Sequence, residues 1–457
     1  GLGIAAASFV FIEARTIPKT SSGKIVRHLA PSLMREGRLH VVSQVDSVLE
    51  TDTLDVEPNA LFRRFGLSGA ETWTLADAGF DSIKLVEFSH ALREQLESDG
   101  DHDLSRAVDL RVLQKIAVCE LFDLLEQVAA AAPHARLRLR RALSDLGREH
   151  RAVEAEMMRR DTRLRFDVGA LPVATDAAAA AEGAVLLTGG TGFLGPFLLT
   201  TLLQQTTDDI YVLVRANDGD EAMRRLREGL MSVATDGTSC PERWAHRLRP
   251  ICGDLSAANL GLTQSTWRTL ADRVHTIYHN GALVNYLLDY HAMRDANIGG
   301  TNEVIRLAMS HRAKVLNHIS TTFVFGWSVK ESLFEHDTNA NMEHLDFGYS
   351  QSKWVSEQVV RDAMQQGLRA RIFRPALLTP SVHGGGCNFD ISIRLLAFMI
   401  NHGIGTTAQN QVSFCPADLA ADNIVAISRA AGSLGATYHV TRDDYASMSD
   451  LTMILGE

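Results

Sequence analysis

A tyrosine, a lysine and a run of hydroxyl residues are the side chains of this sequence best suited to chemistry. The apolar pattern of FGYSQSKWVSEQVV predicts a helix, which places Tyr349 and Lys353 one turn apart on one face. A neighbouring ammonium favours phenolate, so such a pair is suited to general acid catalysis. Upstream, the predicted strand in KVLNHISTTFVFG ends in Ser320, Thr321 and Thr322, where the Thr321 hydroxyl could hold a carbonyl oxygen. The alternative is a surface Tyr–Lys pair on an amphipathic helix.

A glycine-rich turn lies earlier in the chain and directly follows the apolar strand AVLLTG. Glycines let such a turn close tightly and let the backbone approach a pyrophosphate, whose charge is stabilised at a helix N-terminus. Strand, turn, helix and second strand occur in the order that a dinucleotide site requires, although a merely structural turn is the alternative. The candidate cofactor residues of this turn are Gly189, Thr191, Gly192, Phe193, Leu194 and Gly195.

Three polar residues follow later predicted strands. Arg215, in YVLVRAN, stands where an NAD site would carry an acid for the ribose hydroxyl. A guanidinium there suits a ribose phosphate, which favours NADPH over NADH, while a strand cap at the surface is the alternative. Asp218 and Asp220 follow closely. Asp254, in ICGDL, and Asn280, after TIYH, end two further strands at the carboxyl edge, where open parallel sheets bind ligands.

The elements that must position these residues are indicated by changes in hydrophobic pattern and composition along the chain. Strands alternate with helices throughout residues 181–457, which predicts an α/β fold with a Rossmann-type, doubly wound parallel sheet. Residues 46–132 are acidic and carry helical apolar stripes, which predicts a small all-α bundle. Residues 133–180 predict a helical linker whose interleaved acids favour a solvated helix over an RNA-binding segment. Residues 1–45 are too few for a core of their own.

The composition of the chain excludes several classes of protein. The chain has 457 residues and a net charge of −10, which argues against a protein whose main task is to bind nucleic acid. Its 5 cysteines show neither CxxC pairs nor metal-ligand spacing, so we expect no metal site and a reducing, cytoplasmic environment. No apolar run reaches the roughly 18 residues of a membrane span. The chain begins GLGIAAASFVF, without an initiator Met, and we expect it to be a fragment.

Residues 181–457 resemble an extended short-chain dehydrogenase/reductase, specifically the thioester reductase domain that ends some nonribosomal peptide synthetases and carboxylic acid reductases. The resemblance implies that Thr321, Tyr349 and Lys353 are catalytic, that Lys353 also binds the cofactor ribose, and that the cofactor is NADPH. The sequence departs from the family in RPALLTP, and it stops at SDLTMILGE, so we expect the reductase to be incomplete at its C-terminus. The segments that carry the resemblance are LLTGGTGFLG, YVLVRA, GDL, HNGALVNY, NIGGTNEVIRLA, HISTTFVFG, YSQSK and FRPALLTPSVHGGGCNFD.

Two shorter resemblances concern the N-terminal part. LADAGFDSIKLVEF resembles an acyl or peptidyl carrier domain, which implies a four-helix bundle over 46–132, covalent phosphopantetheine on Ser82 and a phosphopantetheinyl transferase as partner. A plain helix N-cap at Ser82 is the alternative. PKTSSGK resembles the last motif of adenylate-forming ligases, particularly fatty acyl-AMP ligases, with Lys24 as its lysine. Residues 1–45 then correspond to the C-terminal tail of a ligase, and the adenylation body is missing.

The order of ligase tail, carrier and reductase implies one reaction. An acyl thioester tethered on Ser82 would be released by NADPH as an aldehyde, or as an alcohol after a second reduction. Two alternatives stay open: an extended short-chain reductase or epimerase that acts on a free small molecule, and a non-catalytic carrier or docking module.

Overall fold

The structure is a computed structural model that describes most of the chain. The described residues are 9–12, 41–45, 58–80, 82–98, 104–105, 108–130, 134–172, 183–234, 241–286, 288–326, 330, 332–339, 345, 347–383, 385–386, 397, 399–400, 405 and 411–456. The chain divides into two units, Gly1–Val56 and Glu57–Glu457. In the first, β1 (Phe9–Ile12) pairs antiparallel with β2 (Val41–Val45). The predicted ligase-tail residue Lys24 lies outside the described residues.

The second unit begins with short helices around a core of their own. Phe62 and Phe88 are fully buried there, and their rings meet edge to face at 5.6 Å, an arrangement that aromatic pairs favour. The apolar stripe predicted on one helix, from Leu85 to Leu96, is buried in the same core. The helices are α2 (Pro58–Arg64), α3 (Ser82–Ser98), α5 (Leu110–Leu113), α6 (Val118–Ala129) and the start of α7 (Ala135–Asp161).

A seven-stranded parallel sheet organises the rest of the unit, as the alternation of strands and helices predicts. Its order is β12-β8-β7-β6-β3-β4-β5, so the chain reverses direction across the sheet between β3 and β6. In doubly wound sheets that switch point, at the carboxyl ends of the strands, is where ligands bind. The strands are β3 (Ala184–Thr188), β4 (Asp209–Val214), β5 (Leu248–Cys252), β6 (Val274–His279), β7 (Val315–Ile319), β8 (Arg369–Pro375) and β12 (Thr437–Val440).

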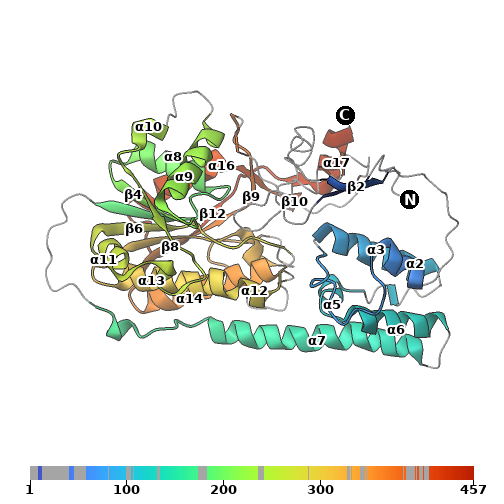
Figure 1. The fold of residues 1–457 in the computed structure, drawn as a ribbon. Helices are drawn as coiled ribbons and strands as arrows, with labels where there is room; N and C mark the ends of the chain where they lie inside the picture. The colour runs from blue at the N-terminus through green and yellow to red at the C-terminus, as the bar shows by residue number, and fades with distance from the viewer. Residues whose placement is uncertain are drawn as a thin grey trace. The chain divides into compact units, whose positions relative to one another are not determined.

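Helices cover both faces of this sheet, which makes it a three-layer Rossmann-type fold (Figure 1). All five residues of β3 are buried: Val185 and Leu187 face one helical layer, and Ala184 and Leu186 face the other. The first layer contains α8 (Gly195–Gln205), α9 (Gly219–Val233) and α16 (Ala417–Arg429). The second contains α11 (Gln264–Arg273), α13 (Gly300–Met309) and α14 (Gly348–Gln365).

Shorter elements complete the described fold. The helical elements are η2 (Val168–Ala170), α10 (Pro241–Trp244), η3 (Ala258–Gly261), α12 (Tyr290–Arg294), the π-helical turn η4 (Asp295–Gly299), η5 (Thr322–Phe325) and α17 (Met448–Gly456). The strands are the parallel pair β9 (Leu377–Thr379) and β11 (Phe414–Pro416) and the antiparallel pair β10 (Gln411–Val412) and β13 (Ala446–Ser447). None of the described helices is both long and apolar enough to cross a membrane.

The C-terminal end of α7 is joined to the Rossmann-type fold by a buried carboxylate. Asp161 accepts hydrogen bonds from Tyr290 Oη at 2.9 Å and from Arg294 Nη2 at 2.6 Å. Arg165 Nη2 adds a third at 3.1 Å. Burial raises the pKa of Asp161, but the hydrogen bonds from Arg294 and Tyr290 outweigh it and hold that pKa below its ordinary value. The end of the predicted linker is therefore fixed to α12 by these hydrogen bonds. The domain boundaries given above stay predictions.

Candidate active site

The glycine turn has the shape that a bound dinucleotide requires. Gly189 has a φ of +70°, and a Cβ there would lie 2.6 Å from the Cα of Gly281. A Cβ on Gly195 would collide with the carbonyl oxygen of Gly189. On Gly192, by contrast, a Cβ would have only that same oxygen nearby, at 3.4 Å. Two glycines thus let turn and helix pack closely, and the middle one leaves the backbone open to a pyrophosphate.

The neighbouring turn residues contribute backbone more than side chains. Leu194 is buried in the first-layer core, Phe193 packs against that core, and Thr191 is half-buried. The helix α8 begins at Gly195, so its first N–H groups lack intrahelical partners at this edge of the sheet. These residues therefore fit a phosphate group through their N–H groups and the helix dipole.

Two arginines lie at the end of β4. Arg215 is exposed directly after the strand, and the guanidinium of Arg225, from α9, donates a hydrogen bond to the Arg215 carbonyl oxygen. Asp218, the nearby acid, caps α9 by accepting a hydrogen bond from Glu221 N at 2.8 Å. Arg225 was not among the residues predicted from the sequence; the available signal was its place between the buried Ala222 and Leu226, on the inner side of α9.

Asn280 and Asp254 differ in what they contact. Asn280 Nδ2 donates to the carbonyl oxygen of Gly189 at 3.1 Å, which joins the end of β6 to the glycine turn. Asp254 Oδ1 accepts from both the backbone N (2.8 Å) and the Oγ (2.7 Å) of Ser256, so one oxygen of this carboxylate closes its own turn. The structure therefore brings Asn280 to the predicted cofactor turn and engages Asp254 locally.

The three predicted catalytic residues lie on elements that pack together. Tyr349 is in the first turn of α14, and Lys353 follows one turn later. Lys353 Nζ donates a hydrogen bond of 2.6 Å to the carbonyl oxygen of Ile319, at the end of β7. Thr321, two residues further on, caps η5 by accepting from Phe323 N at 3.2 Å, and η5 contacts α14. A strand end and a helix thus bring a hydroxyl, a phenol and an ammonium to one edge of the sheet.

Burial lowers the pKa values of the lysine and the two histidines at this edge of the sheet. Lys353 is 4% exposed, and burial lowers its pKa to about 8, although the carboxylate of Glu357 acts to raise it. Burial and the charge of Lys353 lower the pKa of His279 to about 3, and that of His318 well below its ordinary value. Both histidines are therefore neutral near pH 7, whereas Lys353 is mostly protonated there.

A buried amide holds the loop after β6 against α14. Asn297 Oδ1 accepts from Leu283 N at 2.7 Å, and its Nδ2 donates to Ser352 Oγ at 2.8 Å. Asn297 lies in the π-helical turn η4, and such turns are frequent at functional sites. The segment NIGGT, which contains Asn297, is part of the family resemblance, but the sequence pattern did not predict a role for this amide.

The ring of Tyr286 packs against the predicted general acid, Tyr349. The ring of Tyr286 lies 5.6 Å from that of Tyr349, 5.8 Å from that of Phe347 and 6.0 Å from that of Phe323. Phe347 is 36% exposed. Tyr286 thus packs against rings from two other segments of the chain, and one of these rings is that of Tyr349.

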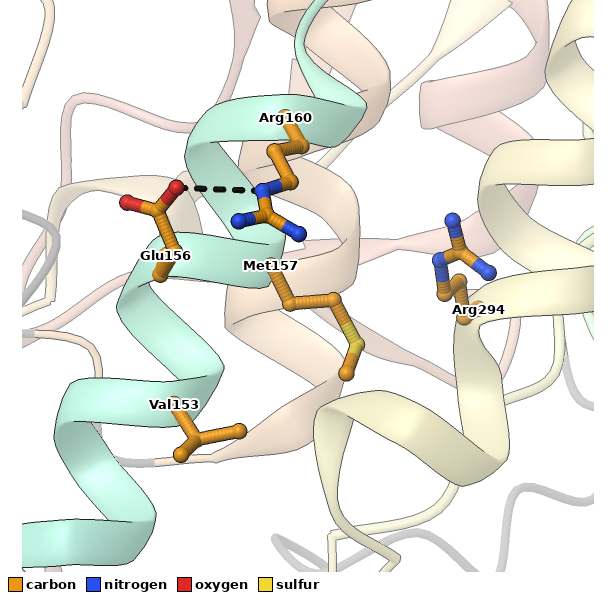
Figure 2. Close-up of a pocket in the computed structure, with 5 residues that line it drawn as sticks. All are labelled: Val153, Glu156, Met157, Arg160 and Arg294. Carbon is orange, nitrogen blue, oxygen red and sulfur yellow. Dashed lines mark hydrogen bonds and ion pairs between the residues drawn. The ribbon is translucent and has the colours of Figure 1, made fainter.

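The other predicted sites are less fully described. Ser82 is the first residue of α3. Both interpretations of this serine, a helix N-cap and a modification site, stay predictions. Within the described ranges, no group of three or more His, Cys, Asp or Glu side chains is placed to hold a metal ion. A cavity of about 590 Å³ is lined by residues of α7 and by Arg294. Figure 2 shows the side chains that line it. Its arginines already have carboxylate partners, since Arg160 pairs with Glu156 and Arg294 with Asp161.

Comparisons with known proteins show what this chain is similar to. Residues 187–424 match the NAD-binding family described as male sterility protein. The chain is 39% identical over 272 residues to a subunit of the linear gramicidin synthase of Brevibacillus parabrevis, covering 59% of this chain and 5% of that protein. It is 34% identical over 271 residues to the large subunit of L-2-aminoadipate reductase of Penicillium chrysogenum, covering 56% of this chain and 19% of the relative.

A solved structure is also similar to this chain. The terminal R domain from the myxalamid PKS-NRPS biosynthetic pathway is 36% identical, with a TM-score of 0.59, over 65% of this chain and 75% of that domain. The family match spans more than half of the chain and includes the glycine turn, β7 and α14. The chain therefore belongs to the NAD-binding family described as male sterility protein.

Proposed function

We propose that this chain is an NADPH-dependent reductase that releases a carrier-bound acyl thioester as an aldehyde. The observation that carries the proposal is the tie between Lys353 and Ile319, which holds a buried ammonium one turn from Tyr349 and beside the strand end that bears Thr321. Relatives named as a linear gramicidin synthase subunit and as the large subunit of an L-2-aminoadipate reductase support the same class of chemistry.

Thr321, Tyr349 and Lys353 each have a different role in the proposed reduction. A nicotinamide cofactor held through the glycine turn would supply hydride to the thioester carbonyl carbon. The Thr321 hydroxyl holds the carbonyl oxygen, and the Tyr349 phenol donates a proton to it as the carbon–oxygen double bond becomes single. The Lys353 ammonium stabilises the resulting phenolate. The hemithioacetal then loses the carrier thiol to give an aldehyde, and a second reduction would give an alcohol.

The preference for NADPH rests on the end of β4. Arg215 and Arg225 bring two guanidinium groups to the place where the second strand of such folds meets the cofactor ribose. Guanidinium groups bind phosphate oxygens through charge-assisted hydrogen bonds. Asp218, the nearby acid, has one carboxylate oxygen engaged as the cap of α9.

The carrier part of the proposal rests on the helices that precede α7. Ser82 would bear phosphopantetheine at the start of α3, after a turn in which Gly79 has a φ of +80°. A phosphopantetheinyl transferase and an upstream adenylating enzyme would load it. Lys24 would be a remnant of that ligase. We place the protein in the cytoplasm, because its cysteine spacing lacks a disulfide framework.

Single-turnover oxidation of NADPH tests the proposal. The full chain, phosphopantetheinylated and acyl-loaded, should lose the near-ultraviolet absorbance of NADPH and release an aldehyde that is identified by mass spectrometry. Ser82→Ala should abolish turnover of the tethered substrate and preserve turnover of a soluble acyl-pantetheine thioester. If Ser82→Ala left turnover of the tethered substrate unchanged, the carrier role would be wrong, and if neither substrate oxidised NADPH, the reductase role would be wrong.

A further inference from the structure

A buried ion pair lies behind the strand end that carries Thr321. Arg374, from β8, donates to the carboxylate of Glu357 on α14 through Nε at 2.9 Å and Nη2 at 2.8 Å. Both side chains are 1% exposed. A bidentate, fully buried pair of this kind has a fixed geometry, and burying it is costly unless its remaining hydrogen bonds are satisfied.

The same carboxylate also holds the residue next to Thr321. Ser320 Oγ donates to Glu357 Oε1 at 2.6 Å, a short bond to a charged acceptor. Lys353, one turn before Glu357 on α14, already holds the carbonyl oxygen of Ile319. Consecutive residues at the end of β7 are thus tied to consecutive turns of one helix, and Thr321 follows directly.

Arg374 extends this network to a third segment. Its Nη1 donates to the carbonyl oxygen of Asp337 at 3.0 Å, and its guanidinium lies over the ring of Phe325, 4.7 Å from the centroid. The carboxylate of Glu357 therefore connects β8, the end of β7 and the turn around Asp337 to the helix that carries Tyr349 and Lys353.

We propose that Glu357 is a positioning residue of the reductase site, which fixes Thr321 relative to Tyr349 and Lys353 through Ser320 and Arg374. This inference rests on the proposed function. Glu357 touches neither substrate nor cofactor in it, and it acts only through the residues that it holds.

Glu357 also sets the charge balance at Lys353. The charged and titratable groups around Lys353 come from three strands and its own helix: His279 from β6, His318 from β7, Arg374 from β8 through its pair with Glu357, and Tyr349 and Glu357 from α14. Both histidines are neutral, and the negative charge of Glu357 raises the pKa of Lys353 against the effect of burial. Without that charge, Lys353 loses its proton at lower pH.

Two variants separate the positioning from the charge. Glu357→Gln removes the charge and one of the two acceptor oxygens, which disrupts the bidentate pair with Arg374. We therefore expect kcat for NADPH oxidation to fall roughly 10- to 100-fold and the alkaline limb of the pH profile to move to lower pH. Ser320→Ala keeps the charge, so kcat should fall while the alkaline limb stays in place. Glu156→Gln, the same change in an exposed acid of α7, is the matched control and should behave as wild type.

The position of Thr321 gives a readout that needs no turnover. Because Glu357→Gln leaves Arg374 buried without its carboxylate, it can fail to fold, and Ser320→Ala is the milder variant. A crystal structure of the folded variant should show the Ser320–Thr321 backbone displaced from α14. The proposal is wrong if Thr321 stays in place and kcat and the alkaline limb are unchanged. An inactive wild type with a displaced Thr321 in the variant would instead overturn the proposed function alone.

Discussion

The ammonium of Lys353 donates a hydrogen bond of 2.6 Å to the carbonyl oxygen of Ile319, so a buried charge joins α14 directly to the end of β7. One turn later, Glu357 accepts from Ser320 Oγ at 2.6 Å. Residues four apart on a helix share a face, so the two ties bind neighbouring strand residues in register. The edge of the sheet where Thr321 lies is therefore held by two charged side chains, and one of them, Lys353, also takes part in the proposed reduction.

Tyr349→Phe should abolish reduction and leave cofactor binding intact. The variant removes only the phenolic oxygen, so the ring contact with Tyr286 is kept while the proton donor is lost. We expect single-turnover NADPH oxidation to slow roughly 10²- to 10⁴-fold, and the Kd for NADPH to change little. Tyr286→Phe is the control, because its hydroxyl has no assigned part in the chemistry. Equal losses in both variants would show that the effect is not specific to the Tyr349 hydroxyl and would contradict its role as the proton donor.

Arg215→Ala and Arg225→Ala should weaken NADPH binding much more than NADH binding. Each variant removes a guanidinium at the end of β4, and a hydrogen bond to a charged group is worth about 1.5–3 kcal/mol. We expect the Kd for NADPH, measured by fluorescence titration, to rise roughly 10- to 100-fold per variant. Arg268→Ala, at an exposed position of α11, is the control. A uniform loss for both cofactors would mean that these arginines support the strand end and do not read the phosphate.

Local patterns predicted the parts of this site that depend on one stretch of chain. The order of strand, glycine turn and helix around Gly189, and the one-turn spacing of Tyr349 and Lys353, follow from neighbouring residues alone. The parallel sheet followed from alternating strands and helices, because a parallel connection needs a crossover.

Contacts between distant segments could not be predicted in this way. Ser320 and Glu357 are separated by 37 residues, and Asp161 and Arg294 by 133. Each pair meets only because the sheet order and the helix layers bring them together. Arg225 and Asn297 were missed because a polar residue within a helical pattern looks solvated until the partner that it faces is known.

Reduction should fail as the pH rises through the pKa of Lys353. Only the protonated form supplies the ammonium, and burial lowers its pKa to about 8, so the active form is lost as the pH rises above that value. The measurement is kcat for NADPH oxidation between pH 6 and 10. Lys353→Met should be inactive at every pH in that range. A wild-type rate that stays flat to pH 10 would contradict the role of a buried ammonium.

Asp161→Asn should destabilise the fold without changing the chemistry. The variant removes the charge that receives Tyr290, Arg165 and Arg294. Breaking a buried pair costs about 3–5 kcal/mol, and we expect about 2–3 kcal/mol here because Arg165 and Arg294 are 33% and 34% exposed. The free energy of unfolding from urea titration measures this cost. Asp272→Asn, at a 53% exposed carboxylate, should change it by less than about 1 kcal/mol.

Lys314 should make the stability of the fold rise with pH above neutrality. Its side chain is 1% exposed, and its Nζ donates to the carbonyl oxygens of Ser310 at 2.9 Å and Arg312 at 2.8 Å. Burial lowers its pKa from 10.5 to about 7. Between these two values the unfolded chain binds more protons than the folded one, so the free energy of unfolding increases with pH by at most about 1.4 kcal/mol per unit.

Lys314→Met isolates this effect, because Lys353 contributes equally to the pH dependence of both proteins. The variant also takes the donor away from two carbonyl oxygens and so lowers stability at every pH, which makes the slope, and not the absolute value, the quantity to compare. Urea titrations at pH 7, 8 and 9 should give a smaller increase in the free energy of unfolding for Lys314→Met than for wild type. The same substitution at Lys330, which is exposed, is the control. Parallel slopes for wild type and Lys314→Met would show that Lys314 keeps its proton in the folded state up to pH 9, because its two carbonyl acceptors then offset the cost of burial.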